Sequence, residues 1–159
     1  MGGYIEKLRV WWHYEFEDQE VLHRLKVHIL EMLADVVQVA LVGTLARGCR
    51  YRGWIDNQSS MFAIRGQNSR DPKLMELLYV RHAILRREAV RPEASAYVAT
   101  EDNISDPISR GKFTEFLKRA AEERGERELT RIAIQRSPLA NELRTLIHHL
   151  CQISLLTTP

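Results

Sequence analysis

Segments rich in aromatic and β-branched residues alternate along this chain with longer segments of helical periodicity. The strand-like segments are residues 4–16, 49–55 and 94–100, and the helix-like segments are residues 19–45, 71–90 and 107–128. An order of strand or hairpin, helix, strand, helix, strand, helix predicts an α/β fold. With 159 residues and 45% hydrophobic content, the chain is long enough to bury one ordinary core.

The last part of the chain has a pattern of its own. Residues 129–135 could be a further strand, and Ser137-Pro138 has the form of a helix start. The helix that follows is amphipathic, with an apolar stripe made by Leu139, Leu143, Leu146 and Leu150. We therefore predict a domain over residues 1–128 and a C-terminal extension over 129–159, which buries its stripe in the fold or against a partner chain.

Several features of the sequence limit the class of protein. Cys49 and Cys151 form neither a disulfide framework nor a zinc set, which favours a reducing compartment. The histidines lack metal-ligand spacing, and no glycine-rich phosphate loop occurs. No apolar run reaches the roughly 18 residues of a membrane span, and the start lacks the layout of a signal peptide. We expect a soluble, intracellular protein without a membrane partner.

Basic residues gather in the central third of the chain. The net charge is only +2, from 23 Lys and Arg against 21 Asp and Glu, which is too weak to indicate a polyanion partner. From Arg47 to Arg91, however, ten basic residues stand against only four acidic ones. This segment is either a phosphate-facing surface or a solvated one. The predicted nucleic-acid contacts, with one further arginine downstream, are Arg47, Arg50, Arg52, Arg65, Arg70, Lys73, Arg86, Arg87 and Arg110.

The three tryptophans differ in what their surroundings predict. Trp11 and Trp12 lie in an aromatic strand-like segment and are expected in the core. Trp54 lies beside Arg52, and stacking on a nucleic-acid base is as plausible for it as core packing.

Three carboxylates stand in a fixed order on different predicted elements. Glu31 lies within the helical segment Ile29-Leu30-Glu31-Met32-Leu33-Ala34, and Asp56 ends the strand in Gly53-Trp54-Ile55-Asp56-Asn57. Asp106 lies at a helix start in the passage Asn103-Ile104-Ser105-Asp106-Pro107-Ile108-Ser109-Arg110. Carboxylates that converge from separate elements could hold two divalent ions about 4 Å apart for phosphodiester hydrolysis, because Mg²⁺ prefers hard oxygen ligands.

Each carboxylate also has a simpler local interpretation. Asp56 could be a turn or cap residue, and Ser105 or Asp106 could cap a helix that has Pro107 in its first turn. Glu31 lies about opposite the apolar stripe of its helix, which favours a solvated side chain. That helix is apolar around most of its circumference, however, so it could also place Glu31 at the rim of a sheet.

Taken together, the three segments resemble the ribonuclease H domain that follows the polymerase in retroelement reverse transcriptases. In that family a helix Glu, a strand-end Asp and the Asp of an N-x-x-D-x-x-S-R passage hold metal ions. The resemblance covers residues 2 to about 115. It implies a mixed sheet flanked by helices, and it implies that Glu31, Asp56 and Asp106 bind Mg²⁺ if the chain cleaves RNA–DNA hybrids.

The chain departs from the family at its start. The family has a first Asp on an earlier strand, just before a Gly-Gly-Tyr turn, and this chain begins Met1-Gly2-Gly3-Tyr4. We therefore expect an N-terminally truncated ribonuclease H-like sheet with a helical C-terminal extension. Native proteins avoid unpaired edges on both sides of a gap, so another strand must fill the central position. The candidates are residues 129–135, which contain no carboxylate and would not restore catalysis, a strand from another chain, or a rearranged Ile5–Trp12 segment.

Three hypotheses for function follow. The first is a nucleic-acid-binding or structural component of a larger assembly, with RNA favoured over DNA, no cofactor and no independent catalysis. The second is a Mg²⁺-dependent RNA–DNA hybrid nuclease whose missing Asp comes from another chain or lies outside the sequence. The third is a protein interaction module, in which the basic face binds an acidic protein surface and the last amphipathic helix docks in a groove.

Overall fold

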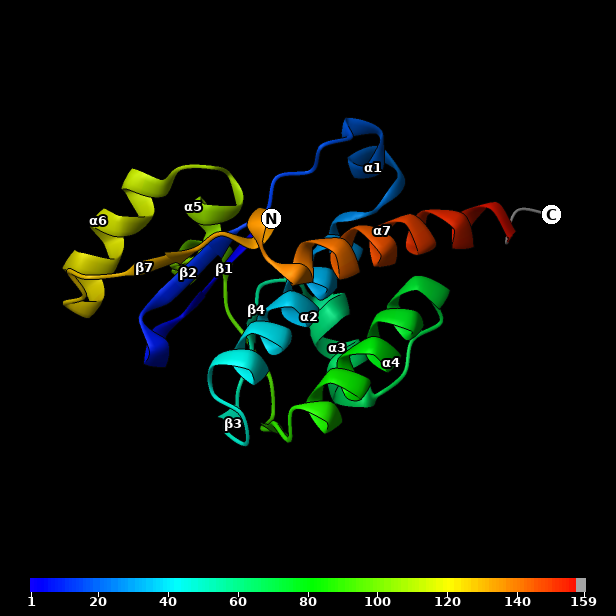
Figure 1. Cartoon of the computed structure of the whole chain (residues 1–159), viewed down its shortest axis with the longest axis horizontal. Coiled ribbons are helices and arrows are strands. Elements are labelled where there is room, and N and C mark those ends of the chain that lie inside the picture. Colours follow the sequence, from blue (N-terminus) through cyan, green and yellow to red (C-terminus); the bar gives the residue numbers. More distant parts are fainter. Residues whose placement is uncertain (157–159) are drawn as a thin grey trace.

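A buried central helix, α2 (Val27–Leu45), organises the fold in the computed structural model, which describes residues 1–156 (Figure 1). It packs against α4 (Pro72–Arg87) on one side and β1 (Gly2–Ile5) on another. Eleven of its nineteen residues are buried. The predicted helix over residues 19–45 is interrupted at Lys26, whose backbone is extended, so a short helix α1 (Gln19–Arg24) precedes α2. The fold is mixed α/β, as the sequence predicted.

The same helix bears on the expectation that the chain has no membrane span. Among the described residues, α2 is the one helix long and apolar enough to span a membrane, although no such segment was predicted. Most of the apolar stretch of this helix is buried inside the protein, as in the core helix of a soluble protein. Its apolar circumference follows from its position, because the sheet and several helices cover it on different sides.

The predicted hairpin over residues 4–16 is present. β1 pairs antiparallel with β2 (Val10–His13), and a 3₁₀ turn over Glu6–Leu8 joins them. Arg9 closes this turn in the left-handed conformation, with φ of 51°. β7 (Thr130–Ile132) pairs parallel with the other edge of β2, which gives the sheet order β1-β2-β7. The tail strand therefore lies on the far side of β2 and does not fill a position beside β1.

The predicted strand over residues 49–55 is bent into two short strands. β3 (Arg50–Tyr51) pairs parallel with β5 (Arg91–Pro92), and β4 (Trp54–Ile55) pairs parallel with β6 (Ala96–Tyr97). The interruption falls at Gly53, where a Cβ atom would stand 3.0 Å from Asp35 Oδ1. A side chain at this position would crowd Asp35 and Tyr51, because the strand passes close to α2.

Helical segments account for the rest of the first 128 residues. α4 begins as predicted, since the Asp71 carboxylate accepts a hydrogen bond from the backbone N–H of Lys73. α3 (Gln58–Gly66) was not predicted. The predicted helix over 107–128 is divided into α5 (Asp106–Ser109) and α6 (Phe113–Arg124), with Gly111 between them at a φ of 73°.

Two helical layers enclose the hairpin. Trp12 on β2 is fully buried on the α2 side, in the main core. Trp11 points to the opposite face and packs with Ile108 of α5 and Phe116 of α6 in a smaller core. The prediction that both tryptophans are core residues is confirmed.

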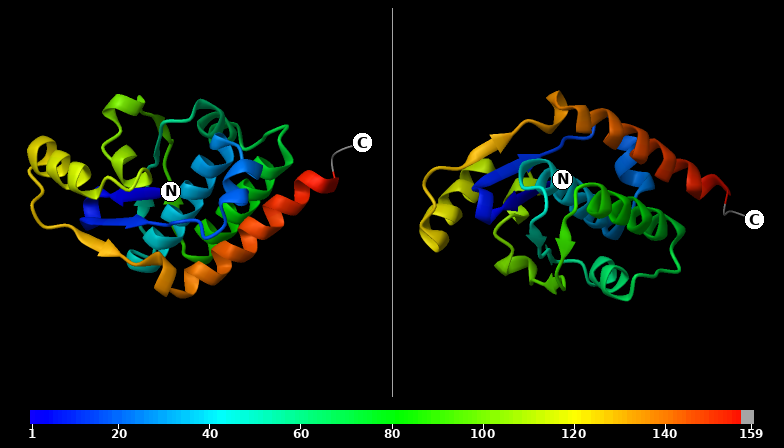
Figure 2. Two further views of the ribbon diagram at one scale, coloured as in Figure 1. Left: turned by 90° about the horizontal axis from the view of Figure 1, so that it is seen from above. Right: turned by 60° about the horizontal axis from the view of Figure 1, so that its bottom comes forward.

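The C-terminal extension packs against the main body. A 3₁₀ turn over Ile134–Arg136 leads into α7 (Pro138–Leu156), which lies along α4 and α1 (Figure 2). The buried residues of its apolar face join the main core; they are Leu143, Ile147, Leu150 and Cys151. The predicted amphipathic helix is confirmed, and residues 157–159 of the predicted extension lie outside the described residues.

Candidate functional site

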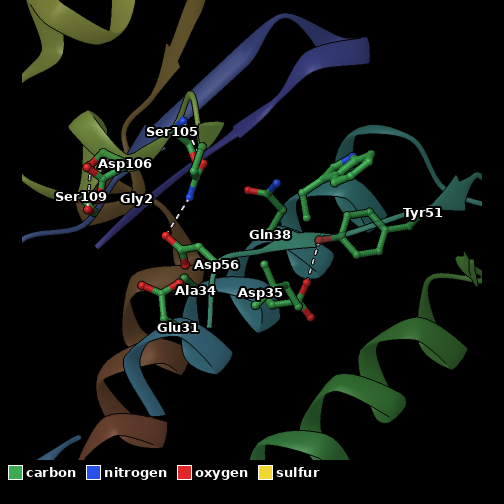
Figure 3. A pocket seen from close by; sticks show the side chains of 14 residues that line it. Gly2, Glu31, Ala34, Asp35, Gln38, Tyr51, Asp56, Ser105, Asp106 and Ser109 are labelled. Carbon is green, nitrogen blue, oxygen red and sulfur yellow. Dashed lines mark hydrogen bonds between the residues drawn. The ribbon is translucent and has the colours of Figure 1, made fainter. Parts of the chain in front are cut away.

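A groove opens between β1 and β4, with one side of α2 as its floor (Figure 3). It encloses about 520 Å³ of free space, part of it open to solvent. All three predicted carboxylates line it: Glu31 from α2, Asp56 after β4 and Asp106 at the start of α5. The structure thus brings together side chains that lie 25 and 50 residues apart in the sequence.

Glu31 is partly buried at the rim of the groove, so it is not the solvated glutamate that its helical position favoured. Burial raises the pKa of Glu31 to about 8, and the carboxylate of Asp56 adds to this rise through repulsion and a hydrogen bond. The charge of Asp106 also raises the pKa of Glu31, whereas the N-terminal ammonium lowers it. Glu31 therefore keeps its proton at neutral pH, close to the carboxylate of Asp56.

Asp56 is free of the capping role that its position suggested. The next residue, Asn57, caps α3, because its side-chain oxygen accepts from the backbone N–H of Ser60 at 3.1 Å. The Asp56 carboxylate instead turns toward the groove and accepts from Asn103 Nδ2 at 3.0 Å (Figure 3). The loop before α5 therefore helps to hold this carboxylate in place.

The passage before α5 is organised by Asn103. While its amide nitrogen donates to Asp56, its Oδ1 accepts from the backbone N–H and the hydroxyl of Ser105, at 3.0 and 2.7 Å. Ser105 is the N-cap residue of α5, but its side chain makes no capping bond. Asp106 forms an ion pair with Arg110 at 2.9 Å, so this arginine neutralises part of the charge of the groove.

The carboxylates do not amount to a complete metal site. Carboxylate oxygens are the ligands that Mg²⁺ prefers. Over residues 1–156, however, no three His, Cys, Asp or Glu side chains stand close enough together to hold a metal ion. Glu31 and Asp56 are neighbours, whereas Asp106 is held by Arg110. The donors are therefore suitable in kind for Mg²⁺, but no set of three is assembled among residues 1–156.

A buried charge network beside the groove was missed by the sequence interpretation. Asp35, one turn after Glu31 on α2, accepts from Arg81 Nε at 2.6 Å and from Tyr51 Oη at 2.8 Å. All three side chains are buried. This network joins α2, α4 and β3, and so fixes the helix that carries Glu31 against the strand that leads to Asp56. The signal in the sequence was an aspartate in an otherwise apolar stretch of α2.

Most of the predicted basic contacts are exposed, and many of them gather at the end of β3 away from Asp56. Arg47 donates to the carbonyl of Arg87, and Arg50 lies opposite Arg91 in the β3–β5 pair. Together with Arg86, which lines a shallow second groove with Arg91, they form what we call the basic rim. Arg50 lies six residues before Asp56, so these two residues are at most about 20 Å apart.

The other predicted contacts have different surroundings. Arg50 and Arg52 both pair with Glu93, at 3.0 and 3.3 Å. Arg65 donates to the carbonyl of Ser95, and Arg70 is exposed. Lys73 does not lie on the surface, because it is buried and its ammonium donates to the carbonyl of Arg24. We therefore remove Lys73 from the predicted contacts.

Trp54 is 63% exposed at the groove, which contrasts with the two buried tryptophans of β2. It alternates along β4 with Ile55, whose side chain is buried in the main core. An exposed indole beside carboxylates is available for stacking on a base.

Replacing Glu31 with glutamine should make the protein more stable at neutral pH. An unfolded glutamate titrates near 4.5, whereas the folded Glu31 titrates near 8. Between these values the folded state keeps a proton that the unfolded state has lost, so stability falls as pH rises through this window. We expect Glu31→Gln to gain about 1 to 3 kcal/mol at pH 7, after allowance for partial exposure, and less at pH 5. Urea unfolding at both pH values measures this, and an equal fall of stability with pH in both proteins would contradict it.

Comparisons with protein-family models, with curated proteins and with solved structures found no match to this chain.

Proposed function

We propose that this chain is a ribonuclease H-like domain that binds nucleic acid, with RNA favoured over DNA, and that does not hydrolyse it alone. The observation that carries the proposal is the groove that collects Glu31, Asp56 and Asp106 from a helix, a strand end and a helix start. Their order matches the segments on which the resemblance rests.

The order of elements gives further support. A hairpin precedes α2, and two parallel strand pairs follow, with α5 beginning after the second. A three-stranded sheet on one side of the groove and the β3–β6 strands on the other are what a mixed sheet would leave if one central strand were absent. The absence of independent hydrolysis is inferred from the shortage of metal ligands over residues 1–156.

The binding surface that we propose is the basic rim together with the arginines toward the groove. Arginines attract the phosphate backbone irrespective of sequence, and each phosphate contact releases counterions. Exposed Trp54 could stack on a base near the carboxylates.

Salt-dependent RNA binding tests this proposal. Affinity for a single-stranded RNA should fall steeply with salt, and the double variant Arg86→Glu with Arg87→Glu should bind at least about tenfold more weakly, with a salt slope smaller by about 1.4. The matched control is Arg136→Glu with Arg144→Glu, which makes the same charge change in the C-terminal extension. Equal weakening by both pairs, or no RNA binding at low salt, would refute the proposed surface.

A second candidate is a Mg²⁺-dependent RNA–DNA hybrid nuclease that is completed by a carboxylate from another chain or from outside the sequence. The crowded Glu31 and Asp56 pair favours it, because a divalent cation would relieve the repulsion between them. We expect no cleavage by the chain alone in magnesium. Cleavage of a hybrid that disappears in Asp56→Asn would instead show that the chain is a nuclease by itself.

A further inference from the structure

β1 has hydrogen-bonding groups that its sheet does not use. In its antiparallel pairing with β2, Met1 and Tyr14 exchange hydrogen bonds, so the next bonded pair is Gly3 with Trp12. The N–H and C=O groups of Gly2 and Tyr4 consequently point away from β2. The Tyr4 carbonyl accepts from Gln38 Nε2 at 2.9 Å, and Gly2 lines the groove.

The strand on the opposite side of the groove, β4, also has backbone groups that its own sheet does not use. The carbonyls of Gly53 and Ile55 accept from Ala96 and Val98, so these residues use their backbone groups toward β6. By alternation, the N–H and C=O groups of Trp54 point to the other side, and Trp54 lines the groove. Two strand edges with outward-facing backbone groups therefore border one groove.

The described chain does not supply a strand for this position. The tail strand β7 is on the far edge of β2, and the segment from Ile5 to Trp12 is used in the hairpin. Of the three sources that the sequence left open, residues 1–156 leave only a segment from elsewhere. A Cβ at Gly2 would collide with Ile108 and one at Gly3 with Gln38, so α5 and α2 pack closely against the faces of β1 at these positions.

The charge of the groove specifies its occupant further. Glu31 and Asp56 hydrogen-bond to each other, and Arg110 is paired with Asp106. The N-terminal ammonium, which also acts on Glu31, donates to the carbonyl of Tyr14. A positive group beside Glu31 and Asp56 would be attracted by the carboxylate of Asp56 and would favour ionisation of Glu31. We propose that the groove binds an extended segment of a partner protein as an added β-strand between β1 and β4, with a lysine or arginine directed at Glu31 and Asp56. This inference is independent of the proposed RNA binding, and either one can fail while the other holds.

Hydrogen exchange with synthetic peptides tests the inference on the full chain. The probes are six-residue peptides of alternating valine and threonine that carry lysine, aspartate or asparagine near one end. The lysine peptide should slow exchange of the amides of Gly2, Tyr4 and Trp54. The amides of Arg91 and Glu93, which already donate to Cys49 and Tyr51 carbonyls, should not change. The lysine peptide should bind about tenfold more tightly than the asparagine peptide, and Asp56→Asn should remove most of this difference.

Two substitutions at Trp54 distinguish the role of its backbone N–H from that of its indole side chain. Trp54→Pro removes the N–H that faces the groove and should abolish peptide binding, whereas Trp54→Ala keeps this N–H and should bind the lysine peptide within about threefold of the original. Binding by no peptide would overturn the inference. Binding of the aspartate peptide only in the presence of MgCl₂ would overturn the basic partner and favour the nuclease. Slow exchange of the same amides at high protein concentration without peptide, together with a dimer by light scattering, would assign the groove to a second copy.

Discussion

Replacing Arg81 with methionine should destabilise the protein by about 3 to 5 kcal/mol, because the substitution leaves the charge of Asp35 buried without its partner. The two side chains are 2% and 4% exposed, and their Nε and Oδ2 atoms are 2.6 Å apart. Tyr51 donates to the other oxygen of Asp35, but a neutral hydroxyl does not replace the lost charge. Urea unfolding followed by circular dichroism measures the loss.

The matched control replaces both members of the pair. Asp35→Leu combined with Arg81→Met removes both charges and should recover most of the lost stability, since a buried ion pair contributes little more than a well-packed apolar pair. Tyr51→Phe removes one hydrogen bond and should cost only about 1 to 2 kcal/mol. A loss under about 1 kcal/mol for Arg81→Met would mean that the pair is open to water, contrary to its burial.

This network also shows what the sequence could not reveal. Arg81 was counted among the basic residues of the central third, and nothing in the sequence indicated that it pairs with Asp35, because a sequence reports residue types and not distant partners. The same limit applies to Lys73, whose burial depends on the carbonyl of Arg24. Long-range pairing, rather than local pattern, decides which charges face water.

The elements that sequence reasoning predicted well are those with strong local signals. The start of α4 at Asp71-Pro72 and the hairpin of aromatic residues are examples. α3 was missed because its apolar residues, Met61 to Ile64, are consecutive and show no helical spacing, although the Asn57 cap was a usable signal. The bend at Gly53 depends on the close passage of the strand by Asp35, which no local pattern reveals.

The candidate site was predictable in its residues and not in its geometry. Glu31, Asp56 and Asp106 were named from order and spacing, and all three line one groove. Their crowding, and the pairing of Asp106 with Arg110, depend on packing between α2, β4 and α5.

Deleting residues 129–159 should give an insoluble protein or one that no longer unfolds cooperatively. The deletion removes β7 from the edge of β2 and removes Ile134, Leu143, Ile147 and Leu150 from the main core. Burying each such side chain is worth roughly 1.5 to 3 kcal/mol, so their joint loss approaches the whole stability of an ordinary domain of about 5 to 15 kcal/mol. Solubility after expression and a thermal unfolding scan measure the result.

Single substitutions on α7 make the same test without truncation. Leu150 is fully buried, and Leu150→Ala should cost about 2 to 5 kcal/mol because it leaves a cavity between α7 and the core. Glu142 is exposed on the same helix, and Glu142→Ala should change stability by no more than about 0.5 kcal/mol. If the truncated chain stayed soluble with unchanged thermal stability, or if both substitutions had equally small effects, α7 would be an appendage, and the core would be complete without it.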